Sequence, residues 1–180
     1  MARIELWNGD ICDLEVDAIV NAANPSLWMA TGVGGAIKRA GGDAIEFAAV
    51  RQAPVSIGDA IVTPAGDLAA RAVIHAVSLD RDRRTNATII DSAVRNALAR
   101  AREIGVTSIA FPALGTGVGG FPLDEAALVT VRAVRDELPN CPTIQHVTFA
   151  MRGAAAYQAF DAALAATTPG SQADLAKGIA

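Results

Sequence analysis

The sequence contains an apolar stretch that leads into a glycine-rich loop and then into the start of a helix. This feature limits the possible folds and binding sites more than any other part of the sequence. Residues 109–124 read IAFPALGTGVGGFPLD, so glycines follow the apolar run and an acidic residue begins the next helical pattern. Glycine adopts positive φ angles and has no Cβ atom, so successive backbone N–H groups can close around phosphate oxygens. The positive end of the following helix adds to this attraction. The loop therefore predicts a phosphate-binding site that needs no lysine.

The same glycines also fit the dinucleotide-binding pattern G-x-G-x-x-G, through Gly115, Gly117 and Gly120. That kind of site needs an acidic residue about 20 positions further on, at the end of the next strand, to bind the ribose hydroxyls. The acids at that distance, Asp136 and Glu137, fall inside a helical pattern, and the next predicted strand contains no acid. The dinucleotide-binding interpretation is therefore the weaker one.

A second stretch near the N-terminus repeats this chemistry. An apolar run ends in Asn21 and Asn24, and the glycines of residues 32–35 follow at the start of another helical pattern. Asparagine amides both donate and accept hydrogen bonds, so they suit sugar hydroxyls as well as neighbouring backbone. We interpret Asn21 as a turn former bonded to its own backbone and Asn24 as a sugar-binding residue.

Apolar runs and helical periodicity alternate along the chain. The runs predict strands at Ile4–Trp7, Ala18–Asn21, Ala60–Thr63, Ala72–Val77, Ser108–Phe111 and Ile144–Ala150. Helices are predicted near Gly35–Arg51, Asn86–Ile104, Asp124–Leu138 and Ala154–Ala165. This alternation predicts an α/β fold, with a mixed and largely parallel sheet of about six strands that helices cover on both faces.

Composition limits the function further. The chain has 180 residues, 52% of them hydrophobic, and a formal net charge of −4. One domain over residues 1–166, followed by a flexible tail over 167–180, is the expected organisation, and we expect a monomer. The negative charge argues against general nucleic-acid binding. Without an apolar signal core or a run of about 18 apolar residues, the chain is expected to be cytoplasmic, with no membrane contact.

Other reactive side chains have structural interpretations. Cys12 and Cys141 are too few for a disulfide framework or a zinc site, so we expect reduced thiols, no metal and no cofactor. His75 and His146 have no nucleophile or acid at the spacing of a catalytic triad.

Two features of the predicted loops each have two possible interpretations. The charged segment 80–84, DRDRR, is either a solvated loop or a contact to phosphate or a partner, and the solvated loop is favoured. Trp28 either shields a cleft as part of a flap or packs within its loop.

Several blocks in order along the chain resemble the macrodomain family. They are Gly9-Asp-Ile11, VDAIVNAAN at residues 16–24, GVGGAI at 32–37, Val73-Ile-His75 and SIAFPALGTG at 108–117. The likeness extends from about residue 4 to residue 160. It implies a three-layer α/β/α sandwich with an ADP-ribose cleft across the strand ends.

The resemblance also implies roles for individual residues. Asp10 would accept from the adenine amino group, although a turn cap is its alternative role. Asn24 would address the distal ribose, and the two glycine segments would cover the diphosphate from both sides. Phe149 or Arg152 would stack on adenine, with Phe149 the better candidate for the core. The complete set of expected ligand-binding residues is Asp10, Ile11, Ala22, Asn24, Gly32, Val33, Gly34, Gly35, Gly115, Thr116, Gly117, Val118, Gly119, Phe149 and Arg152.

The leading functional prediction is a module that binds ADP-ribose, free or as mono-ADP-ribosyl groups on proteins. The alternative is an enzyme that removes ADP-ribose from proteins or deacetylates O-acetyl-ADP-ribose. Hydrolases that resemble the MacroD type carry an aspartate where this chain has Gly34. Hydrolysis here would therefore need a ligand phosphate as the base, with Asn24 as the candidate catalytic residue that positions water or sugar.

Overall fold

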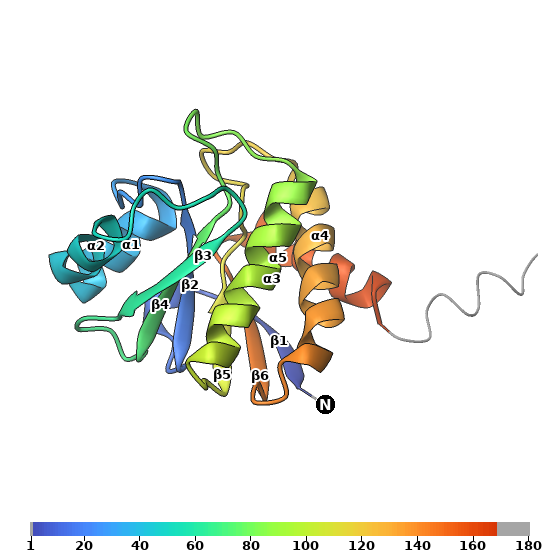
Figure 1. Ribbon diagram of the computed structural model, residues 1–180. Coiled ribbons are helices and arrows are strands. Elements are labelled where there is room, and N and C mark those ends of the chain that lie inside the picture. Colours follow the sequence, from blue (N-terminus) through green and yellow to red (C-terminus); the bar gives the residue numbers. More distant parts are fainter. Residues whose placement is uncertain (1, 169–180) are drawn as a thin grey trace, which may run out of the picture.

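A six-stranded sheet forms the centre of the computed structural model, which describes residues 2–168 (Figure 1). The strands are β1 (Arg3–Asn8), β2 (Ala18–Ala23), β3 (Ala60–Pro64), β4 (Ala72–Val77), β5 (Ser108–Phe111) and β6 (His146–Met151). Their order is β1-β6-β5-β2-β4-β3, and every neighbouring pair is parallel except β3 and β4. The prediction of a mixed, largely parallel sheet is confirmed.

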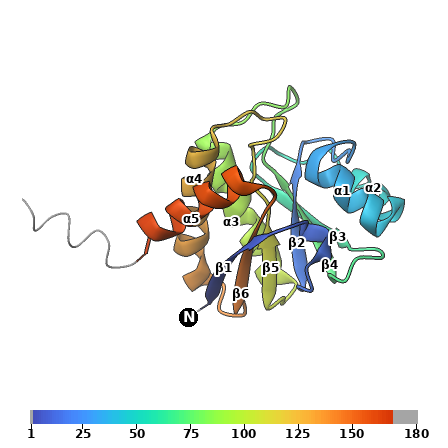
Figure 2. The same cartoon turned by 180° about the vertical axis from the view of Figure 1, so that it is seen from behind.

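Helices cover both faces of this sheet, which confirms the three-layer arrangement (Figures 1 and 2). The helices are α1 (Gly32–Gly41), α2 (Asp43–Val50), α3 (Ala87–Glu103), α4 (Leu123–Glu137) and α5 (Ala154–Ala166), with short 3-10 turns η1 (Ile11–Asp13) and η2 (Leu138–Asn140). On one face, β2 directs Ile19 into a core shared with Ile37 of α1. On the other face, the next residue, Val20, joins the core formed with α3, α4 and α5. This alternation follows from the two-residue repeat of a strand.

The helix predicted over Gly35–Arg51 is two helices, and it begins three residues earlier, at Gly32. The chain breaks at Gly42, whose φ of 93° is rarely adopted by residues with side chains. A Cβ atom on the preceding Gly41 would lie 2.9 Å from the carbonyl oxygen of Ala65, so the backbone of the next loop packs directly against this break. Apolar residues keep their helical spacing across Gly42, so the sequence pattern did not reveal that one helix ends there and another begins.

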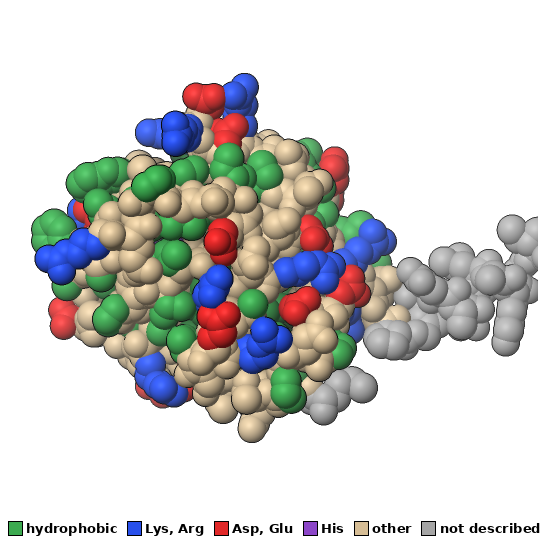
Figure 3. Space-filling model, viewed as in Figure 1, with side chains coloured by type: hydrophobic (Ala, Val, Ile, Leu, Met, Phe, Trp, Pro, Cys, Tyr) green, Lys and Arg blue, Asp and Glu red, His purple; other side chains and the backbone are tan. Residues whose placement is uncertain are grey.

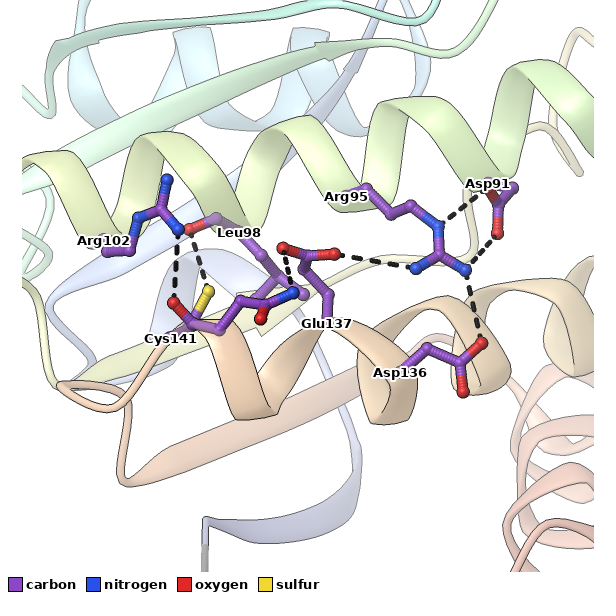
Figure 4. A network of polar contacts seen from close by, with 8 residues as sticks. Asp91, Arg95, Leu98, Arg102, Asp136, Glu137 and Cys141 are labelled. Carbon is purple, nitrogen blue, oxygen red and sulfur yellow. Dashed lines mark hydrogen bonds and ion pairs between the residues drawn. The ribbon is translucent and has the colours of Figure 1, made fainter.

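Charged side chains connect α3 to α4 on the outside of the molecule (Figure 4). Arg95 of α3 bonds Asp91 one turn earlier, with Nε to Oδ2 at 2.9 Å, and reaches Asp136 and Glu137 of α4 at 3.3 and 3.6 Å. These contacts raise the pKa of the Arg95 guanidinium, mainly through the hydrogen bonds that it donates to Asp91. The network fixes how the two helices lie against each other, away from the glycine loops.

The predicted tail begins with two residues that are bonded to α5. The Oγ1 atoms of Thr167 and Thr168 donate to the carbonyl oxygens of Ala163 and Leu164, at 2.8 and 2.9 Å. Residues 169–180 of the predicted tail lie outside the described residues. Within residues 2–168, no helix is both long enough and apolar enough to cross a membrane.

Candidate functional site

The loops that the sequence singled out leave the sheet at one edge. Five strands are parallel, so the segments that follow β1, β2, β4, β5 and β6 all start at their carboxyl ends. In α/β sheets, ligands bind at this edge. A pocket of about 520 Å³, called the loop pocket below, lies between the segments that follow β2, β4 and β5. It is lined by residues 21, 22, 24–26, 28–31 and 34, by Pro54, by Leu79, Arg81 and Arg83, and by Val118.

A larger cavity of about 1120 Å³ lies at the opposite end of the molecule, where β1 and β6 begin. Its lining includes Arg3, Arg132 and His146. None of the residues predicted to bind a ligand lines this cavity, and neither glycine segment reaches it. We therefore place the candidate site at the loop pocket, although that pocket is the smaller of the two.

The first glycine segment forms the start of α1 beside the pocket. Gly32 has a φ of 61°, and the N–H of Gly35 donates to the carbonyl of Thr31 at 3.0 Å. Gly34 lines the loop pocket. A Cβ atom at Gly34 would lie 3.0 Å from Oδ1 of Asn21, which is a tighter contact than most Cβ atoms make. The glycine at this position therefore allows helix α1 to pack against the Asn21 amide.

The second glycine loop, residues 112–122, contains glycines of two kinds. Gly115 has a φ of 78°, and a Cβ atom there would lie 2.8 Å from Ile90. A Cβ atom at Gly119 would lie 2.6 Å from the carbonyl oxygen of Gly115. Gly117 has no positive φ and no atom within 4 Å of its Cβ position. Gly115 and Gly119 are therefore needed for the fold of the loop, whereas Gly117 leaves an open surface.

The structure contradicts the predicted turn role of Asn21 and shows a turn role for Asn24, whose predicted contact to a sugar stays a prediction. Asn24 is the turn former, because its Oδ1 accepts from the backbone N–H groups of Ser26 and Leu27 at 3.0 and 3.1 Å. Asn21 lies within β2 and bonds His75 across the sheet, so its interpretation as a turn former is wrong. The reason is the length of β2, which continues to Ala23 and holds Asn21 in extended backbone.

Asn21 and His75 form a buried polar pair. The Nδ2 group of Asn21 donates to Nδ1 of His75 at 3.1 Å, and Nε2 of His75 lies 2.9 Å from Oγ1 of Thr63. Burial lowers the pKa of His75 from 6.5 to about 4, so the ring is neutral near pH 7 and its Nδ1 can accept. Within residues 2–168, nothing donates to Oδ1 of Asn21, which is buried beside the loop pocket.

Asp10 follows the carboxyl end of β1 and does not line the loop pocket. Its Oδ1 accepts from the N–H of Cys12 at 3.1 Å and caps η1, while its Oδ2 lies 3.7 Å from Nη1 of Arg152. The Cys12 hydrogen bond lowers the pKa of Asp10, with Arg152 adding to the effect. Burial and the Asp10 carboxylate raise the pKa of Cys12 to about 12, so this thiol is a poor nucleophile. Asp10 thus has the capping role, and Arg152 lies near it.

Phe149 is a core residue, and its assignment to the ligand-binding set is wrong. Its side chain is fully buried and packs against Phe111 and Phe160, with ring centroids 6.3 and 5.2 Å away. Successive residues of β6 point to opposite faces, and Phe149 points to the face that α4 and α5 cover. Of the two expected stacking residues, only Arg152 is exposed.

The loop pocket combines residues that were predicted with residues that were not. Of the expected ligand-binding set, the pocket lining contains Ala22, Asn24, Gly34 and Val118. It also contains Asn21, Trp28, Arg81 and Arg83, which that set lacks. Among the residues of the described chain that line the pocket, none is an Asp, Glu, His or Cys. Such a pocket can donate and accept hydrogen bonds but has no side chain suited to act as a general base.

The fold and the loops at this edge define an α/β domain with a pocket built from loops at the carboxyl ends of its parallel strands. The profile of the Macro domain family matches residues 20–130, so the chain belongs to the macrodomain family. An uncharacterized protein of Mycobacterium tuberculosis is 46% identical over 166 residues, which cover 92% of this chain and 46% of that protein. This chain therefore spans about half the length of that relative.

Other relatives match over most of their length. A Salmonella typhimurium protein with the name O-acetyl-ADP-ribose deacetylase is 43% identical over 154 residues, covering 82% of this chain and 86% of that protein. A Trypanosoma brucei macrodomain in complex with ADP-ribose has a TM-score of 0.83 at 29% identity, covering 89% of this chain and 68% of that one. An Oceanobacillus iheyensis macrodomain variant with ADPR has a TM-score of 0.82 at 28% identity, covering 89% and 90%.

Proposed function

We propose that this domain binds ADP-ribose, either free or as a mono-ADP-ribosyl group on a protein. The observation that carries the proposal is the pair of glycine segments, at Gly32–Gly35 and Gly115–Gly119, that leave the same sheet edge beside the loop pocket. Backbone N–H groups can bind a diphosphate there although the chain has a net charge of −4. Solved relatives with ADP-ribose or ADPR support the choice of ligand.

The proposed pose runs along the edge of the sheet. Adenine lies near Asp10 and Arg152, whose opposite charges suit the amino group and the face of the ring, respectively. The diphosphate lies between the glycine segments. The distal ribose enters the loop pocket, where Asn24 and the unpaired Oδ1 of Asn21 offer polar atoms to its hydroxyls.

Calorimetric titration with ADP-ribose, ADP and AMP tests the proposal. ADP-ribose should bind most tightly and AMP least, because AMP lacks both the second phosphate and the distal ribose. ADP-ribose should also raise the melting temperature, since it binds the folded state. No heat and no thermal shift at saturating ADP-ribose would refute the proposal.

A second candidate function is hydrolysis of O-acetyl-ADP-ribose, favoured by the 43% identity to the relative with that enzyme's name. The lining of the loop pocket provides no carboxylate, so a ligand phosphate would act as the base while Asn24 or Asn21 positions water. Incubation of the pure protein with O-acetyl-ADP-ribose, with acetate release followed over time, separates an enzyme from a binding module. Tight binding without acetate release above the uncatalysed rate would rule out the deacetylase function.

A further inference from the structure

The mouth of the loop pocket carries a charged segment that the ADP-ribose pose does not use. Residues Asp80–Arg84, called the 80–84 loop below, connect β4 to α3, and their side chains project at the top of the molecule in Figure 3. Arg81 and Arg83 line the loop pocket, and both side chains are exposed. The sequence alone favoured a solvated loop here, but two of its cations border the candidate site.

The 80–84 loop has a defined conformation. The Oδ1 atom of Asp80 accepts from the N–H groups of Asp82 and Arg84, both at 2.8 Å, and the backbone of Asp80 and Arg84 is also paired. Arg83 lies between these bonds with a φ of 62°. A non-glycine residue in this conformation costs free energy and persists where the surrounding contacts hold it. These bonds define the backbone of the 80–84 loop, from which the exposed side chains of Arg81 and Arg83 extend beside the loop pocket.

The charges within the loop leave two cations available. Arg84 pairs with both acids of the loop, at 3.4 Å from Nε to Oδ2 of Asp80 and also through Asp82. No acidic side chain in the described part of the chain forms an ion pair with Arg81 or Arg83. The mouth of the pocket thus presents two guanidinium groups in a protein with a net charge of −4.

A second turn beside the loop pocket, at residues 24–27, also combines a side-chain cap with a positive φ angle. Asn24 Oδ1 accepts from two backbone N–H groups, and Leu27 within that turn has a φ of 61°. Leu27 and Arg83 are the non-glycine residues with positive φ in residues 2–168. The asparagine turn leads to Trp28, which is 59% exposed, and the second glycine loop adds Val118, which is 56% exposed. Two exposed apolar side chains therefore lie around the same mouth as the two free arginines.

We propose that this mouth binds the polypeptide to which ADP-ribose is attached, and that it favours an acidic segment. Arg81 and Arg83 bind carboxylates that flank the modified residue, while Trp28 and Val118 contact the apolar parts of the segment. A guanidinium fork matches a carboxylate in geometry and charge. Two cations beside an otherwise acidic protein suit a short peptide better than the long phosphate backbone of a nucleic acid. The inference rests on the proposed function, because ADP-ribose must first occupy the adjoining site.

The test compares two synthetic peptides of equal length, each mono-ADP-ribosylated at the same central residue. One has Glu and Asp at the flanking positions, and the other has Gln and Asn. The protein should bind the acidic peptide about tenfold more tightly, the effect of two exposed ion pairs. The double variant Arg81→Gln/Arg83→Gln should lose this preference and bind the two peptides with the same Kd. Arg132→Gln, an exposed arginine on α4, is the control and should keep the preference.

Each result has a separate meaning. If the unmodified protein binds free ADP-ribose but binds both peptides equally, the inference is wrong and the proposed function stands. If the double variant loses affinity for free ADP-ribose as well, the arginines belong to the ADP-ribose site and the inference is wrong. Tighter, arginine-dependent binding of an ADP-ribosylated oligonucleotide than of the acidic peptide would also overturn it. No binding of free ADP-ribose removes both proposals.

Discussion

Asn21 gives its amide hydrogen to Nδ1 of His75, at 3.1 Å, and thereby turns its own carbonyl oxygen toward Gly34 and the loop pocket. His75 is neutral near pH 7 because burial lowers its pKa to about 4. A neutral ring with Nε2 near Thr63 keeps Nδ1 as an acceptor, so the orientation of the Asn21 amide is fixed from behind the site. The buried pair therefore connects a structural histidine to the proposed distal-ribose site.

Replacing Asn21 by Ala should lower the free energy of unfolding and also weaken ADP-ribose binding. The stability loss is about 1–3 kcal/mol, because Nδ1 of His75 loses its buried donor. Thr63→Val is the matched control, since it removes the partner of the other ring nitrogen and does not line the pocket. Urea unfolding and calorimetric titration of both variants test this. Equal ADP-ribose affinity in the two variants would exclude Asn21 from the ligand site.

The free energy of unfolding should fall between pH 7 and pH 5 through His75. Its folded pKa of about 4 lies below the ordinary value of 6.5, so the unfolded state takes up a proton that the folded state does not. Stability is therefore present above pH 6.5 and is lost toward pH 4, by about 1.4 kcal/mol per pH unit. His75→Gln should flatten the dependence in urea titrations. An unchanged slope in His75→Gln would refute this assignment.

Gly117→Val should abolish or strongly weaken ADP-ribose binding with little change in melting temperature. Its Cβ position is open and its φ is not positive, so the fold accepts a side chain there, while a bulky group blocks the approach of phosphate to backbone N–H. The expected loss is about tenfold or more. Gly115→Ala is the contrasting variant, because φ is 78° and Ile90 lies 2.8 Å from the new Cβ, so it should lower the melting temperature. Near-normal affinity in Gly117→Val would show that the proposed pose is incorrect.

Asp10→Asn should relax the preference for adenine while preserving the local turn. An asparagine keeps an oxygen that accepts from the N–H of Cys12, so η1 remains capped, but the carboxylate that would accept from the adenine amino group is lost. Affinity for ADP-ribose should fall by about tenfold, and affinity for the hypoxanthine analogue should change little. Calorimetry with both ligands measures the two effects. If the ratio of the two affinities is unchanged, Asp10 serves only as a cap.

The class of fold and the position of the glycine segments could be predicted from local patterns in the sequence. Alternating apolar runs and helical periodicity depend on local spacing, so strands such as Ala72–Val77 were predicted at their observed bounds. The blocks at residues 16–24 and 108–117 identified the family for the same reason, because they are contiguous in the chain. The glycine segments could be recognised in the same way, because a glycine-rich stretch directly after an apolar run is a pattern of neighbouring residues.

Tertiary contacts, by contrast, set which polar side chains serve the fold and which face the pocket. The roles of Asn21 and Asn24 depend on a histidine 54 residues away and on where β2 ends. Gly117 is distinguished from Gly115 by the neighbours of its absent side chain, which come from other segments. Arg81 and Arg83 gained a candidate role because their loop lies beside Trp28 at the pocket mouth. These distinctions depend on contacts between distant segments, which spacing along the chain does not encode.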